Sequence, residues 1–130
     1  MSACYGQEEP AWNMAMLLPH HQAAVVKKGK LVDYLLAEGH PSGQHKARFF
    51  LSLGFRPDRH EELRAALLQH AANHAVSSTR SSRFGTRYVV DGPVQGPGGR
   101  IAQVRCVWFI ASGEVEPQLV TAYPLRGFRS

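Results

Sequence analysis

The chain has 130 residues and a formal net charge of +5, because 15 Lys and Arg residues outnumber 10 Asp and Glu residues. Its mass of 14.4 kDa fits one domain. A hydrophobic share of 44% can form a core, and a charged share of 19% is too low for a disordered chain. No apolar stretch approaches the roughly 20 residues that span a bilayer. The composition therefore excludes an integral membrane protein, a multidomain enzyme and a disulfide-dense scaffold, and the basic balance favours RNA or DNA as a partner ahead of a membrane.

The first part of the chain has little structural pattern. We expect residues 1–15 to be a flexible leader and residues 16–130 to form a single domain. The first charged residues are Glu8 and Glu9, whereas a secretory signal begins with Lys or Arg. The two cysteines, Cys4 and Cys106, are too few for a disulfide framework. We therefore expect a cytoplasmic protein, which a specialised export route could still deliver into a target cell.

Helical spacing of apolar residues dominates the first half of the chain. It predicts about three helices, over Lys27–Glu38, about Gly43–Leu53, and about Asp58–Val76. Asp58 and Glu61 stand three residues apart, which resembles the start of a capping box at the third helix.

The pattern changes to alternation after Ser77. Residues 77–82 are rich in serine and are expected to form a loop. Strands are predicted over Arg83–Asp91, Ile101–Ile110 and Gln118–Tyr123. Gly92–Gly99 is expected to be a connection or a hairpin region that could include an edge segment. Helices followed by strands predict an α+β fold in which N-terminal helices precede a small antiparallel β-meander.

The second predicted helix begins with an unusual run of basic residues. His45, Lys46 and Arg48 lie in its first turn and a half, where the helix dipole favours anions. A phosphate bound at this helix start would explain the run, and the alternative is a surface His beside extended Lys and Arg side chains. His40, on the preceding loop, could act as a general acid or base near pH 7, or it could be a turn residue without a chemical role.

The last predicted strand combines a hydroxyl and a phenol. Alternation places Leu119, Thr121 and Tyr123 on one face, and the same logic places Arg105 and Arg87 on the open face of the sheet. These groups could hold a phosphodiester. The alternative is an ordinary polar outer face.

Three further features carry weaker signals. His70 and His74 have the spacing of metal ligands, but no third ligand is fixed near them by the sequence. We therefore expect structural or surface histidines and no metal or other cofactor. The glycine-rich segment Gly96–Arg100 is no nucleotide fingerprint, although Arg100 could touch a phosphate. The candidate nucleic-acid-binding residues are all arginines, the side chain that best forms paired hydrogen bonds to phosphate: Arg48, Arg83, Arg87, Arg100 and Arg105.

Many of these segments together resemble an uncharacterised family of small bacterial domains. The resemblance covers about residues 16–124 and implies no chemistry, because the family has no settled function. The matching residues are Lys30–Leu36, His40–Phe50, Gly54, Phe55, Gly85, Tyr88–Gly92, Gly96, Pro97, Val107, Trp108 and Leu119–Pro124.

A weaker resemblance links helices, a small sheet and the terminal Thr121-Ala122-Tyr123-Pro124 strand to the metal-independent ribonuclease superfamily of barnase, EndoU, colicins E5 and D, and RelE. Many of its members are toxins of bacterial conflict. The resemblance implies that Thr121 and Tyr123 contact RNA, beside a lysine and histidines from the helical part. Here Lys46, His40 and His45 are the candidates, although their order and spacing differ from those of EndoU.

The sequence thus predicts a metal-independent endoribonuclease of toxin or effector type. It would cleave RNA, tRNA being a candidate, by attack of a ribose 2′-hydroxyl that leaves a 2′,3′-cyclic phosphate. The predicted catalytic residues are His40, His45, Lys46, Thr121 and Tyr123, and a cognate antitoxin or immunity protein is the expected partner. The alternative is a non-catalytic basic module that binds a partner protein or a nucleic acid.

Overall fold

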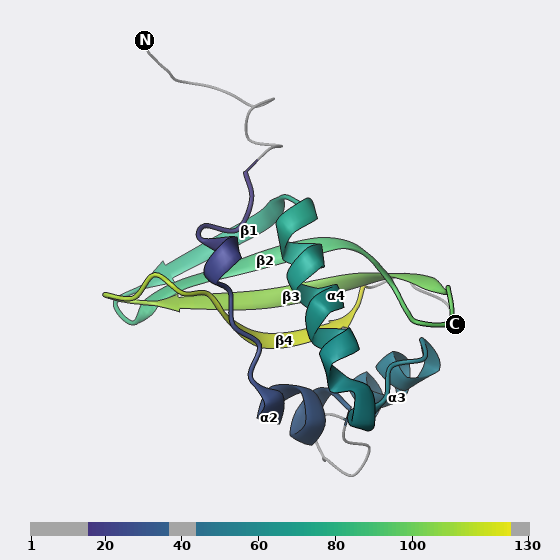
Figure 1. Ribbon diagram of the computed structural model, residues 1–130. Coiled ribbons are helices and arrows are strands. Elements are labelled where there is room, and N and C mark those ends of the chain that lie inside the picture. The colour runs from purple at the N-terminus through teal and green to yellow at the C-terminus, as the bar shows by residue number, and fades with distance from the viewer. Residues whose placement is uncertain (1–15, 37–43, 126–130) are drawn as a thin grey trace.

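A four-stranded antiparallel sheet with the strand order β1-β2-β3-β4 occupies the second half of the chain. The computed structural model describes residues 16–36 and 44–125. The helices precede the sheet, as Figure 1 shows, so the predicted α+β class with an antiparallel meander is confirmed. The strands are β1 (Val76–Ser82), β2 (Gly85–Gln95), β3 (Ile101–Ala111) and β4 (Gln118–Pro124).

Strand β1 was not predicted, and the expectation of a loop over residues 77–82 is wrong. This segment pairs with β2 from Val76, opposite Val90, to Ser82, opposite Gly85. Its residues after Val76 are all exposed, so no apolar alternation marks the strand in the sequence. Pairing with the longer β2 across a tight turn sets the conformation of β1, and burial of apolar side chains does not.

Strand β2 is also longer than predicted. It continues through Gly92 and Pro93, which were assigned to the connection or hairpin region, and ends at Gln95. Val90 and Val94 are both buried on one side of it. The alternation of buried residues therefore continues past the glycine and the proline.

The helical part is less regular than the predicted three helices. A short α-helical turn, α2, runs directly into a π-helical turn, η2, where one longer helix was expected. Asp58 and Glu61 form no capping box, because Arg59 is the N-cap of α4, no side chain caps it, and Glu61 bonds to Arg64. The helical elements are η1 (His21–Ala23), α2 (Lys28–Lys30), η2 (Leu31–Leu35), α3 (Gln44–Ser52), η3 (Pro57–Arg59) and α4 (His60–Asn73).

The hydrophobic core lies between α4 and one face of the sheet (Figure 1). Leu63 and Leu67 of α4 are fully buried, as are Val104 and Trp108 of β3. Helices α2 and α3 lie beyond the β4 edge, on either side of the lower end of α4 in the view of Figure 1. Among the described residues, no helix is long and apolar enough to cross a membrane.

The sheet face turned away from this core is called the outer face below. Its side chains follow from the register, because residues paired across antiparallel strands point to the same side. Asp91, Arg105 and Tyr123 form one row across three strands, and Val89, Val107 and Thr121 form the next. A further row contains Arg80, Arg87 and Phe109.

A β-bulge in β4 decides which side chains reach the outer face. Trp108 pairs with Leu119, whereas Val107 pairs with Thr121, so Val120 is the extra residue. Leu119 and Ala122 are consequently both buried in the core. The predicted alternation was therefore wrong in placing Leu119 on the same face as Thr121 and Tyr123.

Candidate functional site

Four polar side chains meet at the β4 edge of the sheet. The Tyr34 hydroxyl lies 3.4 Å from Thr121 Oγ1, and the Lys46 ammonium lies 5.3 Å from the centre of the Tyr34 ring. The same ammonium lies 6.0 Å from the centre of the Tyr123 ring. The structure thus brings together three of the predicted residues, Lys46, Thr121 and Tyr123, and adds Tyr34. These four residues are called the edge cluster below.

The local folding of each element explains why the edge cluster forms. Leu31 and Leu35 of η2 are fully buried and fix the turn that carries Tyr34. In α3, Ala47 and Phe50 are buried, which leaves Lys46 only partly covered at the border of the apolar stripe. The helical elements therefore hold a phenol and an ammonium against the end of β4.

The environment of Tyr34 favours its ionised form. The hydrogen bond with Thr121 lowers the pKa of the Tyr34 phenol most, while burial opposes this shift. The ammonium groups of Lys46 and Lys30 lower the pKa further, and Lys30 lies 4.9 Å from the ring centre. A site that stabilises a phenolate also favours other anions, including phosphate oxygens.

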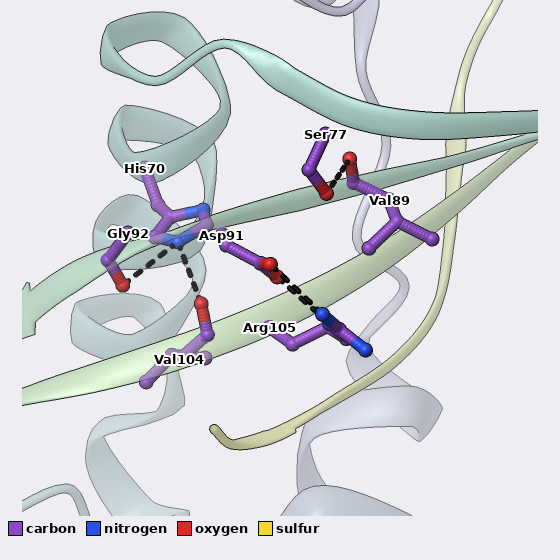
Figure 2. A network of polar contacts seen from close by, with 7 residues as sticks. All are labelled: His70, Ser77, Val89, Asp91, Gly92, Val104 and Arg105. Carbon is purple, nitrogen blue, oxygen red and sulfur yellow. Dashed lines mark hydrogen bonds and ion pairs between the residues drawn. The ribbon is translucent and has the colours of Figure 1, made fainter. Parts of the chain in front are cut away.

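Arg105 is held in place beside the edge cluster by a carboxylate. Its Nε and Nη2 atoms donate to the two carboxylate oxygens of Asp91 at 2.8 and 2.9 Å, a paired geometry that Figure 2 shows. The bonds to Asp91 and a further one with Tyr123 raise the pKa of the Arg105 guanidinium, which stays charged. Both members of the pair are partly exposed, so the guanidinium remains accessible from the outer face.

The two predicted histidines, His40 and His45, fall outside the described side chains. His40 lies outside the described residues. His45 belongs to α3, but its side chain is not among those described. Their chemical roles stay predictions.

The five predicted nucleic-acid-binding arginines do not form one patch. Arg83 lies in the turn between β1 and β2 and packs over the Phe84 ring, with Cζ 5.0 Å from the ring centre. Arg100 lies in the turn at the opposite end of β2 and donates to the Ser52 carbonyl at 3.0 Å. Arg48 is exposed on α3. Only Arg87 and Arg105 share the outer face with Thr121 and Tyr123.

Two residues of this region were not predicted as site residues. Tyr34 lies within the first predicted helix, and no sequence signal indicated that its hydroxyl meets Thr121, 87 residues away. Arg80 was placed in a loop, so its position opposite Arg87 could not be foreseen. An explicit prediction of β1 would have placed Arg80 on the outer face.

His70 and His74 have structural roles, as the sequence led us to expect. His70 Nε2 donates to the carbonyl oxygens of Gly92 at 3.2 Å and Val104 at 3.1 Å, so it links α4 to β2 and β3 (Figure 2). His74 Nδ1 donates to the His70 carbonyl at 2.9 Å. Among the described residues, no group of three or more His, Cys, Asp or Glu side chains could hold a metal ion.

The comparison with protein families finds one match over residues 17–126, described as a domain of unknown function (DUF6883). The chain belongs to this family. This match confirms the resemblance to an uncharacterised family, and its range is close to the expected residues 16–124.

Among solved structures, the chain is similar to one described as "Contact-dependent growth inhibition toxin - immunity protein complex from Klebsiella pneumoniae 342". The TM-score is 0.67 at 16% identity, and the match covers 82% of this chain and 97% of that chain. At this identity the likeness shows a shared fold. The comparison with curated proteins gives no match.

Proposed function

We propose that this protein is a metal-independent endoribonuclease of toxin type, which cleaves RNA to a 2′,3′-cyclic phosphate. The observation that carries the proposal is the edge cluster, in which the Lys46 ammonium, the Thr121 hydroxyl and two phenols meet at one end of β4. The shared fold with a chain of a toxin–immunity complex supports the toxin part of the proposal.

The proposed reaction is a transesterification within the RNA chain. The ribose 2′-oxygen forms a bond to the adjacent phosphorus and loses its proton to a base, for which His40 and His45 are the candidates. The bond from phosphorus to the 5′-oxygen breaks, and that oxygen takes up a proton. Negative charge grows on the phosphate oxygens during this step, so fixed cations lower its barrier.

Each described residue has a proposed role in that step. Lys46 stabilises the charge that develops on the phosphate, and Arg105 supports it from the outer face, fixed by Asp91. Thr121 and Tyr123 position the phosphate. Tyr34 orients the Thr121 hydroxyl, because the two oxygens lie 3.4 Å apart.

The proposal includes a protein partner. A toxin that cleaves RNA must be inhibited in the cell that makes it, so we propose a cognate immunity protein. The similar solved structure is itself a complex of a toxin with its immunity protein.

We further propose tRNA as a substrate, synthesis in the cytoplasm and delivery by a specialised export route.

A cleavage assay tests the proposal directly. Purified protein is incubated with total RNA and a tRNA pool in the presence of EDTA, and fragment ends are analysed for cyclic phosphate. We expect Lys46→Ala to lower the rate about 100-fold or more, because one charge-stabilising donor contributes roughly 3–4 kcal/mol. Lys28→Ala removes the same charge from an exposed lysine of α2 and should retain the rate.

Intact RNA after incubation with the wild-type protein would reject the nuclease. The same holds for fragments that a folded Lys46→Ala variant still produces at the wild-type rate. In the first case the alternative becomes the better hypothesis, namely a basic module that binds a partner protein or a nucleic acid without cleaving it.

A further inference from the structure

The outer face carries a second group of cations in addition to the edge cluster. Arg80 of β1 and Arg87 of β2 are direct cross-strand partners in the register, so their side chains leave the sheet on the same side. Both are exposed. Two like charges directly opposite each other destabilise a pair of strands unless an anion lies between them.

Within the described part of the chain, neither guanidinium has a compensating carboxylate. The described ion pairs involve other residues. Asp91 lies two rows from Arg87 on this face, and its carboxylate already accepts two hydrogen bonds from Arg105. Neither the Arg80 nor the Arg87 side chain has a hydrogen bond to another described residue. Their unbalanced charge is therefore available to an external anion.

These arginines line a pocket and do not merely lie on a flat surface. The lining of the pocket includes Ser78, Arg80, Ser82, Arg87, Val89 and Phe109. The Phe109 ring lies over Gly85, because a Cβ atom built on this glycine would stand 2.6 Å from the Phe109 Cζ atom. The pocket thus combines two cations, hydroxyl groups and an aromatic ring.

The register relates this pocket to the edge cluster. Phe109 and Arg87 lie one row along the outer face from Val107 and Thr121. Same-face rows are separated by two residues of about 3.3 Å rise, and neighbouring strands lie about 4.8 Å apart. From this spacing, the backbone of Arg87 is on the order of 12 Å from that of Thr121. From that position, the Arg87 side chain can reach the part of an RNA strand that neighbours a phosphate bound at the edge cluster.

We propose that this pocket is a subsite for the RNA strand that flanks the cleaved bond. Arg80 and Arg87 hold a phosphate of the neighbouring nucleotide, and Phe109 offers a ring to its base. Arginine pairs suit phosphate because their donors form paired hydrogen bonds, and aromatic rings stack on any base. The proposal rests on the proposed function for its substrate, RNA, but it concerns binding alone.

Binding is tested with a probe that cannot be cleaved. A fluorescent 2′-O-methyl RNA 12-mer of mixed sequence lacks the attacking hydroxyl, so its affinity is measured without the reaction. The variant Arg80→Gln/Arg87→Gln should bind about tenfold more weakly or worse. The slope of its log affinity against log salt concentration should also be less steep than that of the wild type, by about 0.7 for each phosphate that the variant no longer neutralises.

Two controls separate this effect from unfolding and from net charge. Arg56→Gln/Arg59→Gln removes two charges from an exposed region before α4 and should bind the probe like the wild type. Thermal unfolding of both double variants shows whether they are folded. Phe109→Leu should weaken binding while the salt dependence keeps the wild-type slope, because a stacking contact releases no counterions.

The outcomes distinguish this inference from the proposed function. Tight binding that the loss of Arg80 and Arg87 does not weaken would overturn the subsite, as would a wild-type protein that does not bind the probe. Binding through these arginines by a protein that cleaves no RNA would support RNA binding at Arg80 and Arg87 and reject the nuclease. If the two arginines instead mattered only for capture of an acidic protein partner, the RNA subsite would be wrong.

Discussion

The hydroxyl of Tyr34 lies 3.4 Å from the hydroxyl of Thr121, and this contact joins parts of the chain 87 residues apart. It connects the π-helical turn η2 to the edge strand β4. Because Lys46 from α3 lies beside the same ring, three elements meet in one polar contact region. Titration of the Tyr34 phenol therefore reports on the integrity of the edge cluster.

We predict that Tyr34 ionises below the ordinary tyrosine pKa of 10.0. Ultraviolet difference spectra recorded against pH follow each phenolate as it forms, and Tyr34→Phe identifies the band. Thr121→Val should raise the pKa of Tyr34, because it removes the hydrogen bond that lowers the pKa most. Lys46→Ala should raise it less, and a band that both variants leave in place would contradict the contact.

We predict that Asp91 orients Arg105 more than it stabilises the fold. Asp91→Asn removes the carboxylate of a partly exposed pair, so the free energy of unfolding should fall by about 1 kcal/mol or less. The effect on catalysis should be larger than the effect on stability. The cleavage rate should fall roughly tenfold or more, because the guanidinium loses its fixed orientation.

The matched control for that variant is Glu62→Gln, which breaks the exposed Arg59–Glu62 pair with its 3.0 Å separation. It should change the free energy of unfolding by a similar small amount and leave the rate unchanged. Denaturant unfolding and the fragment assay supply the two measurements. Equal rates for Asp91→Asn and the wild type would show that Arg105 needs no such support.

A pair of glycines in the β2–β3 turn should differ sharply in their tolerance of a methyl group. A Cβ atom at Gly96 would stand 2.0 Å from the backbone oxygen of Leu53, whereas nothing lies within 4 Å of one at Gly98. Gly96→Ala should therefore cost about 2–4 kcal/mol, and Gly98→Ala should stay within about 0.5 kcal/mol of the wild type. Denaturant unfolding of both variants measures the difference, and equal stabilities would show that the turn does not pack on α3.

The sequence predicted the elements that bury a patterned apolar face. The strand around Trp108 and the helix around Leu63 and Leu67 were found because their alternation or helical spacing reflects burial. Strand β1 has no such pattern, since its residues after Val76 are exposed and its conformation depends on pairing with β2. The bulge at Val120 was missed for a related reason, because a register shift depends on the partner strand.

The candidate site was predicted in part for the same reasons. Thr121 and Tyr123 could be grouped because they lie two residues apart on one strand, and the polar start of the second helix marked Lys46. Nothing in the sequence joined that helix to β4, so their proximity was only a resemblance-based expectation. Tyr34 was missed because a tyrosine at helical spacing is usually a core residue, and here the side chain is only partly covered.

Finally, we predict that His70 makes the fold less stable in mild acid. Burial lowers the pKa of His70 most, and the nearby His74 lowers it further, although the carbonyls of Val104 and Gly92 oppose the shift. The folded protein therefore holds His70 neutral at a pH where the unfolded chain binds a proton. Its contribution to stability is complete above the ordinary pKa of 6.5 and is lost as the pH falls from there through the lowered folded value.

Denaturant unfolding against pH measures this contribution. Over that window the free energy of unfolding of the wild type should fall by up to about 1.4 kcal/mol per pH unit more steeply than that of His70→Gln. The glutamine can donate to the same carbonyls but does not titrate. Comparison of the two curves isolates His70, because the other titrating side chains are common to both proteins. Parallel curves for the wild type and His70→Gln would mean that the buried histidine accepts a proton without cost. Its 2% exposure and its buried Nδ1 atom, which has no hydrogen-bond partner among the described residues, argue against that outcome.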